Sequence, residues 1–210
     1  MMQRGWLLLT LAACGAPSPA PQAPAPAPSA TAAPSAGDAP AAHRHHHDDS
    51  LVGVIDQPAP PWQVAQWFNS PPLALEDLRG KVVLVRWFMD PSCPFCSGTA
   101  PTLRALHERY ADQGLAVIGM YHHKAATPLD PVEVEGWVKH FGYQFPVAID
   151  RDWTTLRRWW LDGHDRSFTS VSFLIDKAGV VRRVHRGGLL APEGDEITAM
   201  RADIERLLAQ

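Results

Sequence analysis

The strongest indication of the fold of this 210-residue chain is the run Lys81-Val82-Val83-Leu84-Val85-Arg86-Trp87-Phe88-Met89-Asp90-Pro91-Ser92-Cys93-Pro94-Phe95-Cys96. Its first nine residues form a nearly continuous apolar run rich in β-branched side chains, which is typical of a central strand buried on both faces. A turn follows at residues 90–92, and apolar side chains at helical spacing run from Ser97 to Asp112. The stretch therefore predicts a strand, a turn, a Cys-x-x-Cys pair and a helix in direct succession.

The two cysteines lie where the predicted strand gives way to the predicted helix. A thiol at a helix N-terminus faces unpaired backbone N–H groups and the positive end of the helix dipole, and both favour the thiolate, which is the nucleophile. We therefore expect Cys93 to be the exposed, attacking thiol. Cys96, one turn later and more buried, is expected to resolve the mixed disulfide that Cys93 forms. Pro94 and Phe95 complete this active-site loop.

Three other interpretations of the pair are half of a zinc site, a static disulfide and two inert core cysteines. A zinc site needs two further ligands, and the histidines of this sequence offer no paired spacing that would supply them. A Cys-x-x-Cys pair between strand and helix favours redox chemistry. We therefore expect catalytic cysteines that need no metal and no cofactor.

The rest of the chain alternates between strand and helix patterns. Strands are expected at residues 115–121, 145–150, 171–176 and 180–185, and helices at residues 131–141, 153–160 and 193–208. Asp130, Pro131 and Glu133 provide a cap, a proline at the first helical position and an early acidic residue for the first of these helices. This order predicts an α/β fold whose sheet is covered on both faces. Residues 51–75 are expected to add an N-terminal hairpin at the sheet edge.

The amino terminus has the pattern of an export signal. Arg4 precedes an apolar run over residues 6–13, which is too short to cross a bilayer because a span takes about 20 helical residues. Leu11-Ala12-Ala13-Cys14-Gly15 resembles the lipobox of bacterial lipoproteins, in which the cysteine is acylated after cleavage. Residues 1–13 are thus interpreted as a lipoprotein signal peptide and Cys14 as the lipid attachment site. An ordinary signal peptide with an incidental cysteine is the alternative.

Residues 14–50 are interpreted as a disordered tether. Residues 15–42 contain 12 alanines and eight prolines among 28 residues, a composition that cannot bury enough apolar surface to fold. The tract from His43 to His47 closes the tether, and we favour a solvated polar run over a metal site there. Residues 51–210 form the predicted domain. They hold 17 basic and 19 acidic residues, a balance that argues against nucleic acid as a partner.

Residues 78–188 resemble the thioredoxin superfamily, specifically the exported TlpA-like thiol–disulfide oxidoreductases with a redoxin domain of the AhpC/TSA type. The resemblance rests on Leu78-Arg79-Gly80-Lys81 before the strand, the Cys-x-x-Cys pair, Pro101, Phe145-Pro146-Val147 and Phe173-Leu174-Ile175-Asp176. It implies a thioredoxin-like fold with a central mixed sheet and helices on both faces. It further implies a monomer that exchanges disulfides with protein partners on the periplasmic side of a membrane. A membrane electron-transfer protein would supply the electrons. The residue after the lipobox cysteine, Gly15, favours sorting of the lipoprotein to the outer membrane.

Three positions depart from the family pattern. Ser92 stands where a tryptophan usually precedes the first cysteine, and Thr99 stands where some relatives carry a glutamate. Ser170 occupies the position of a cis-proline that faces the disulfide in the family. We therefore expect Thr169 and Ser170 to belong to the active-site loop, with the Ser170 hydroxyl and N–H near the sulfur of Cys93.

Two other functions are alternatives to thiol–disulfide exchange. A peroxiredoxin-like thiol peroxidase shares the fold, but its signature requires proline seven residues and threonine or serine three residues before the reactive cysteine. Counting back from Cys93 gives Arg86 and Asp90, so the signature fails. A copper or zinc carrier would use both cysteines and the tract from His43 to His47.

Two histidines and one arginine also have possible roles near the cysteines or in the core. His122 and His123 follow the strand at residues 115–121, so one of them is a candidate proton relay for Cys93, and two solvated loop histidines are the alternative. Arg86 lies inside a buried strand, where an unpaired cation is costly. It is expected either to face solvent or to pair with a carboxylate such as Asp90 or Asp176.

Overall fold

The computed structural model describes residues 51–210 with the exception of residues 52, 65 and 167. The predicted signal peptide, the lipid attachment site Cys14, the tether and the tract from His43 to His47 lie outside the described residues. Within the part that is described, no helix is both long enough and apolar enough to cross a membrane.

The described residues contain every strand and helix that the patterns predict from residue 81 onwards. Most are shorter than predicted, but the strand at residues 115–121 has the predicted bounds and the helix after the cysteines begins earlier. The strands are β1 (Trp67–Phe68), β2 (Val82–Phe88), β3 (Leu115–Tyr121), β4 (Val147–Ile149), β5 (Ser172–Ile175) and β6 (Val181–His185). The helices are α1 (Pro94–Tyr110), α2 (Pro131–His140), α3 (Thr154–Leu156) and α4 (Asp195–Leu208). Short turns of 3-10 or π-helix are η1 (Glu76–Leu78), η2 (Ala111–Gln113) and η3 (Arg157–Leu161).

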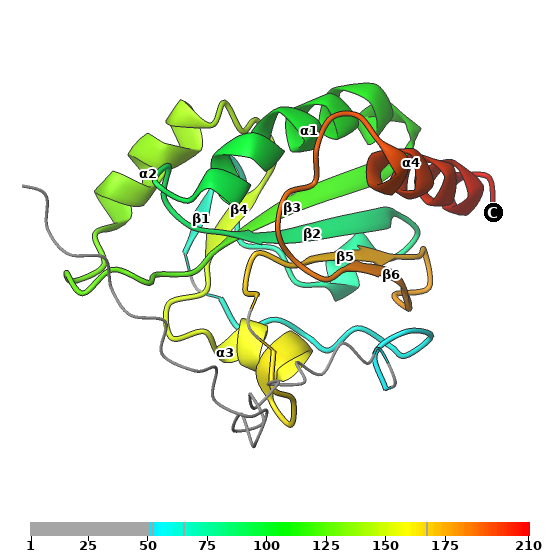
Figure 1. The fold of residues 1–210 in the computed structure, drawn as a ribbon. Coiled ribbons are helices and arrows are strands. Elements are labelled where there is room, and N and C mark those ends of the chain that lie inside the picture. The colour runs from blue at the N-terminus through cyan, green and yellow to red at the C-terminus, as the bar shows by residue number, and fades with distance from the viewer. Residues whose placement is uncertain (1–50, 52, 65, 167) are drawn as a thin grey trace, which may run out of the picture. The chain divides into compact units, whose positions relative to one another are not determined.

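The six strands form one mixed sheet in the order β1-β4-β3-β2-β5-β6. Strands β2, β3 and β4 are parallel, whereas β5 pairs antiparallel with β2, β6 with β5, and β1 with β4. Figure 1 shows α1, α2 and α4 on one side of this sheet and α3 on the other. The predicted α/β fold with a central mixed sheet and helices on both faces is confirmed.

The alternation of side chains along β2 divides the core into two layers. Leu84 and Phe88 pack with α1, α2 and α4, while Val83, Val85 and Trp87 pack with η3 and the N-terminal segment. Because both layers are apolar, the strand is buried along its whole length. Arg86 is the one charged residue of this strand, and alternation places it on the face that carries α1.

The described part of residues 51–75 does not form the expected hairpin. Instead Pro58 forms an isolated bridge with Val180 near β6, whereas β1 pairs with β4 at the opposite edge of the sheet. Trp62 lies between these two points, buried, with its indole N–H donating to the carbonyl of Leu73 at 2.7 Å. Three prolines at positions 58, 60 and 61 remove the N–H groups that a hairpin strand would need, so the segment crosses the second face of the sheet instead.

The helix expected at residues 153–160 is a single α-helical turn, α3, that continues into the π-helical turn η3. The carboxylate of Asp150 accepts the N–H groups of Thr155 and Leu156 at 3.1 and 2.8 Å and the indole N–H of Trp87 at 3.1 Å. These contacts fix the start of the turn. The bond from the Asp162 N–H to the Arg157 carbonyl, at 2.9 Å, closes the wider π turn.

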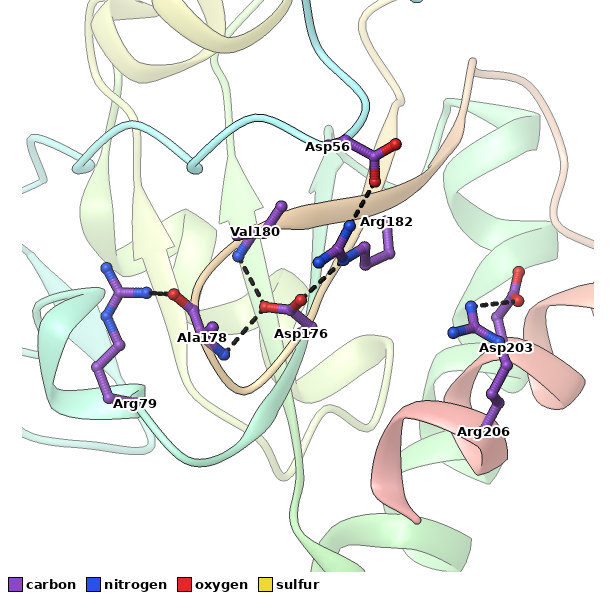
Figure 2. A network of polar contacts seen from close by, with 8 residues as sticks. All are labelled: Asp56, Arg79, Asp176, Ala178, Val180, Arg182, Asp203 and Arg206. Atoms are coloured by element: carbon purple, nitrogen blue, oxygen red, sulfur yellow. Dashed lines mark hydrogen bonds and ion pairs between the residues drawn. The ribbon is translucent and has the colours of Figure 1, made fainter. Parts of the chain in front are cut away.

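The turn between β5 and β6 is organised around Asp176 (Figure 2). Its carboxylate accepts the N–H groups of Ala178 and Val180, both at 2.9 Å, and the Nε–H of Arg182 at 2.7 Å. Arg182 also donates to Asp56, and Arg79 donates to the carbonyl of Ala178. The network therefore connects the hairpin to segments at both ends of the 51–80 region.

Candidate active site

The predicted junction of strand, turn and helix is present, but the helix begins three residues earlier than expected. Strand β2 ends at Phe88, and α1 starts at Pro94 rather than at Ser97. Cys93 is therefore the N-cap residue and Pro94 occupies the first helical turn, where its missing N–H costs nothing. The Ser97 hydroxyl donates to the carbonyl of Pro91 at 2.7 Å and ties the turn to the helix.

The sulfur of Cys93 accepts two hydrogen bonds from its partner residue. The backbone N–H of Cys96 donates to it at 3.3 Å, and the thiol of Cys96 donates to it at 2.7 Å. Cys93 is only 9% exposed, so the expectation of an exposed thiol is wrong. The reason is its N-cap role, which turns the side chain back onto the helix N-terminus instead of out to solvent.

Cys96 lies deeper, at 1% exposure. Burial and the hydrogen bond to Cys93 raise the pKa of Cys96 to about 12, while the N–H of Met89, at 3.2 Å from its sulfur, and the Ser170 hydroxyl act in the opposite direction. Near neutral pH Cys96 is therefore a thiol and hydrogen-bond donor, and Cys93 is the acceptor. Cys96 is thus the more deeply buried of the two cysteines, as the sequence predicted.

Ser170 faces a different cysteine from the one expected. Its hydroxyl lies 3.7 Å from the sulfur of Cys96, so the predicted contact with Cys93 is replaced by one with Cys96. The difference follows from depth: Ser170 is buried and only two residues before β5, the strand that pairs with β2, so it meets the inner sulfur. Thr169, the preceding residue, is also buried.

His122 is fully buried, so it is not a solvated loop residue. Its Nε2 lies 2.9 Å from the Thr169 hydroxyl, which connects it to the loop that touches Cys96. Burial, followed by the charge of Lys124, lowers the pKa of His122 to about 3, so the ring is neutral and weakly basic at neutral pH. The expected imidazolium beside the cysteines is therefore absent at His122, and this residue instead orients Thr169.

Both ring nitrogens of His123 have partners of their own. Nδ1 lies 2.8 Å from the Tyr121 hydroxyl, and Nε2 lies 2.7 Å from the Thr127 carbonyl. A relay through His123 would have to break one of these contacts. Of the two histidines, His122 is thus the one that the structure connects to the cysteines.

An apolar rim flanks the dithiol. Phe95, within the Cys-x-x-Cys loop, packs edge to face on Phe168 with ring centroids 6.1 Å apart. The two side chains are 41% and 48% exposed, and Leu189, 47% exposed, lies close to Gly98 of α1. Large exposed apolar side chains of this kind are typical of surfaces that bind another protein.

The partners of Arg86 differ from those expected from the sequence. Its side chain neither faces solvent nor pairs with Asp90 or Asp176. It is fully buried and contacts the Ser172 hydroxyl at 3.2 Å and the Gly188 carbonyl at 2.7 Å. Asp176 pairs with Arg182, and Asp90 accepts the N–H of Ser92. The period of two along β2 was the signal that could have placed Arg86 on the face of the cysteines.

Comparison with known proteins places these features in a family. The sequence profile of the AhpC/TSA family matches residues 55–184. The protein DipZ of Mycobacterium bovis is 33% identical over 135 residues, which cover 63% of this chain and 18% of DipZ. The thiol-disulfide oxidoreductase ResA of Halalkalibacterium halodurans is 27% identical over 117 residues, which cover 56% of this chain and 60% of ResA. The chain thus spans about a fifth of the length of DipZ and about three fifths of the length of ResA.

The fold has a counterpart among solved structures. The crystal structure of a protein of the thioredoxin-like superfamily superposes with a TM-score of 0.60 and 29% identity, covering 73% of this chain and 97% of the other. The predicted thioredoxin-like fold is confirmed. Because the family profile spans more than half of the sequence and includes the strand, both cysteines and the β5–β6 hairpin, the chain belongs to the AhpC/TSA family.

Proposed function

We propose that the chain is a thiol–disulfide oxidoreductase in which Cys93 and Cys96 exchange a disulfide with protein partners. The observation that carries the proposal is the asymmetry of the two sulfurs 2.7 Å apart at the start of α1. Two further observations support the proposal: the similarity to the thiol-disulfide oxidoreductase ResA, and the exposed apolar rim formed by Phe95, Phe168 and Leu189.

The reaction follows from the roles of the two thiols. Cys93, as thiolate, attacks one sulfur of a partner disulfide, and the second partner sulfur leaves as a thiolate. Cys96 then loses its proton to solvent and attacks the sulfur of Cys93, which releases the first partner sulfur. Two electrons pass to the partner, and the chain is left with a Cys93–Cys96 disulfide. The reverse sequence oxidises a partner dithiol.

Trapping of mixed disulfides tests this assignment. Cys96→Ala should accumulate covalent complexes with partner proteins, because nothing resolves the bond that Cys93 forms. Cys93→Ala and the double variant should not. Complexes that form equally in both single variants, or in neither, would refute the assignment of attacker and resolver.

A second assay separates exchange from peroxidase activity. The reduced protein should catalyse reduction of insulin disulfides faster than it consumes hydrogen peroxide, since both cysteines are buried and paired with each other. Faster consumption of peroxide that persists in Cys96→Ala would instead assign a thiol peroxidase that works through Cys93 alone.

We further propose that the domain acts outside the cytoplasm as a monomer, attached to a bacterial membrane through lipidated Cys14 and held off its surface by the Pro/Ala-rich tether. The lipobox-like sequence and the composition of residues 15–42 support this location. A membrane electron-transfer protein would then reduce the Cys93–Cys96 disulfide. Cys14→Ser should abolish labelling by a radioactive fatty acid and release the protein from membranes, and unchanged partitioning would refute the anchor.

A further inference from the structure

Arg86 is a buried cation whose described partners are all uncharged. Besides Ser172 and Gly188, its guanidinium contacts Nδ1 of His185 at 3.3 Å and the Thr99 hydroxyl at 3.5 Å, and its Nε has no partner among the described residues. A buried charge without a counter-ion is expensive. An opposite charge that forms nearby during the reaction would offset this cost.

The position of Arg86 identifies where that opposite charge forms. Thr99, its contact on α1, lies three residues after Cys96, which is about one helical turn. Ser172, its partner across β2 and β5, lies two residues after Ser170, whose hydroxyl is 3.7 Å from the Cys96 sulfur. The guanidinium is therefore held by the same two elements, α1 and the segment leading into β5, that hold the sulfur of Cys96.

The histidines and the tyrosine that interact electrostatically with Arg86 are neutral at neutral pH. Burial, with Arg86 itself contributing, lowers the pKa of His185 to about 4, and the pKa of His122 is about 3. Burial raises the pKa of Tyr143 above its ordinary value. Charged side chains on other elements act on these three groups: Glu196 and Arg183 on His185, Lys124 on His122, and Arg104 on Tyr143. Asp90 accepts the N–H of Ser92 in the loop before α1. Burial lowers the pKa of Arg86 only to about 10, so Arg86 keeps its charge.

We propose that Arg86 is a positioning residue whose buried charge stabilises the thiolate of Cys96 while this thiolate resolves the mixed disulfide. The inference rests on the proposed function. In the resolving step the Cys96 thiol gives its proton to solvent, the Cys93–Cys96 bond forms, and the bond from Cys93 to the partner breaks. The partner sulfur leaves with the electron pair and takes a proton from solvent. Arg86 exchanges no proton and lowers the energy of the anion that must form in a buried place.

A disulfide with coloured thiolate products, 5,5′-dithiobis(2-nitrobenzoate), resolves the two steps in a stopped-flow experiment on the reduced protein. The first equivalent of colour reports attack by Cys93 and depends on reagent concentration. The second reports resolution by Cys96 and does not. Cys96→Ala should show the first phase alone, which fixes the assignment of the phases.

Arg86→Gln, which removes the charge and keeps hydrogen-bond donors, should slow the second phase about tenfold at neutral pH and move its pH profile upwards by about one unit, the same free-energy change. Arg86→Lys should restore most of the rate because it keeps the charge. Ser172→Asp places a carboxylate beside the guanidinium and should slow the second phase like Arg86→Gln. This second variant tests the role of the Arg86 charge independently if Arg86→Gln does not fold.

The outcomes separate this inference from the proposed function. A normal first phase with an unshifted second phase in Arg86→Gln or, if that variant does not fold, in Ser172→Asp overturns the role of Arg86 alone. Equal slowing in Arg86→Gln and Arg86→Lys without a shift of the pH profile assigns the effect to hydrogen bonding and also overturns it. A wild-type protein that releases no colour overturns the proposed function, and this role of Arg86 with it.

Discussion

Single residues around the dithiol give the two cysteines opposite properties. Cys93 caps α1 and accepts hydrogen bonds, whereas Cys96 donates one and is shielded from water by the layer that includes Phe88 and Leu103. Burial disfavours an anion at Cys96 by raising its pKa. Resolution therefore depends on the few groups that can stabilise a sulfur anion there: the Met89 N–H, the Ser170 hydroxyl and, as proposed above, Arg86.

Ser170→Ala tests the corrected position of that hydroxyl. Loss of a hydrogen bond worth about 1 kcal/mol should raise the pKa of Cys96 and slow the second colour phase about fivefold, with the first phase unchanged. Ser92→Ala is the matched control, because the Ser92 hydroxyl contacts Asp90 and not a cysteine. Slowing confined to the first phase would place Ser170 at Cys93 instead.

His122 should make stability depend on pH. Its pKa is about 3 in the folded protein and about 6.5 when unfolded, so the unfolded chain binds the proton first. The free energy of unfolding should then fall by up to about 1.4 kcal/mol per pH unit from this residue as pH drops from about 6.5 towards 3. His122→Leu should flatten this slope in urea titrations at pH 7, 6 and 5.

Thr169→Val is the control for that experiment. It removes the hydrogen-bond partner of Nε2 but leaves the histidine buried, so the free energy of unfolding should drop at every pH with the slope retained. An unchanged slope in His122→Leu would show that the ring titrates alike in the folded and unfolded protein.

At the scale of secondary structure, the carboxylate of Asp176 stabilises the turn of the β5–β6 hairpin. Burial opposes ionisation of Asp176, but the hydrogen bonds from Val180, Arg182 and Ala178 outweigh it and hold the pKa of Asp176 below its ordinary value. Because β5 also pairs with β2 and leads back to Ser170, the turn helps to set the position of the loop that touches Cys96.

Asp176→Asn should lower the free energy of unfolding by about 1–3 kcal/mol at pH 7, since the turn N–H groups lose a charged acceptor. A carboxylate with a lowered folded-state pKa contributes stability above its unfolded pKa of about 3.9 and loses it as pH falls through the folded value. The difference between variant and wild type should therefore shrink below about pH 4.

Arg182→Met provides the comparison for Asp176→Asn. It removes the ion pairs of Arg182 with Asp176 and Asp56 and keeps both N–H contacts of Asp176, so it should lower the free energy of unfolding less than Asp176→Asn does. Urea unfolding at matched pH measures both variants. A cost for Arg182→Met equal to that of Asp176→Asn would assign the stability to the ion pair rather than to the turn.

At the scale of the whole domain, two core layers on either side of the sheet hold the site. The segment before β1 closes the second layer, where Trp62 lies 6.0 Å from the Trp67 ring and 6.4 Å from that of Trp159. This layer supports the back of β2, including Trp87, whose ring stands edge-on to that of Trp159 at 5.4 Å. The N-terminal segment is therefore part of the domain core.

Trp62→Ala should destabilise the full-length protein by about 3–5 kcal/mol, as expected for deletion of a large buried aromatic side chain. Trp62→Phe keeps most of the ring and loses the bond to Leu73, so its cost should be smaller. Urea transitions followed by tryptophan fluorescence and by far-UV circular dichroism should coincide in both variants. A separate early transition would show that this segment folds independently of the sheet.

The secondary-structure elements were predictable from the sequence, because they depend on neighbours within a few residues. The apolar run of β2, the cap formed by Asp130 and Pro131, and the run from strand to Cys-x-x-Cys to helix are local signals. They were sufficient to predict an α/β fold and to choose Cys93 and Cys96 as candidate catalytic residues, whereas the mixed sheet was implied by the family resemblance.

The side chains that surround those cysteines could not be predicted from the sequence and became known from the tertiary structure. The pairing of Arg86 with Ser172, the approach of Ser170 to Cys96 and the burial of His122 against Thr169 join residues 47 to 86 positions apart. Such contacts depend on strand register and on how loops pack over the sheet edge, and a shift of one residue in register would turn each side chain to the other face. The pattern within one strand does not say which strand and which residue lie opposite it, so the environment of the site became known only from the fold.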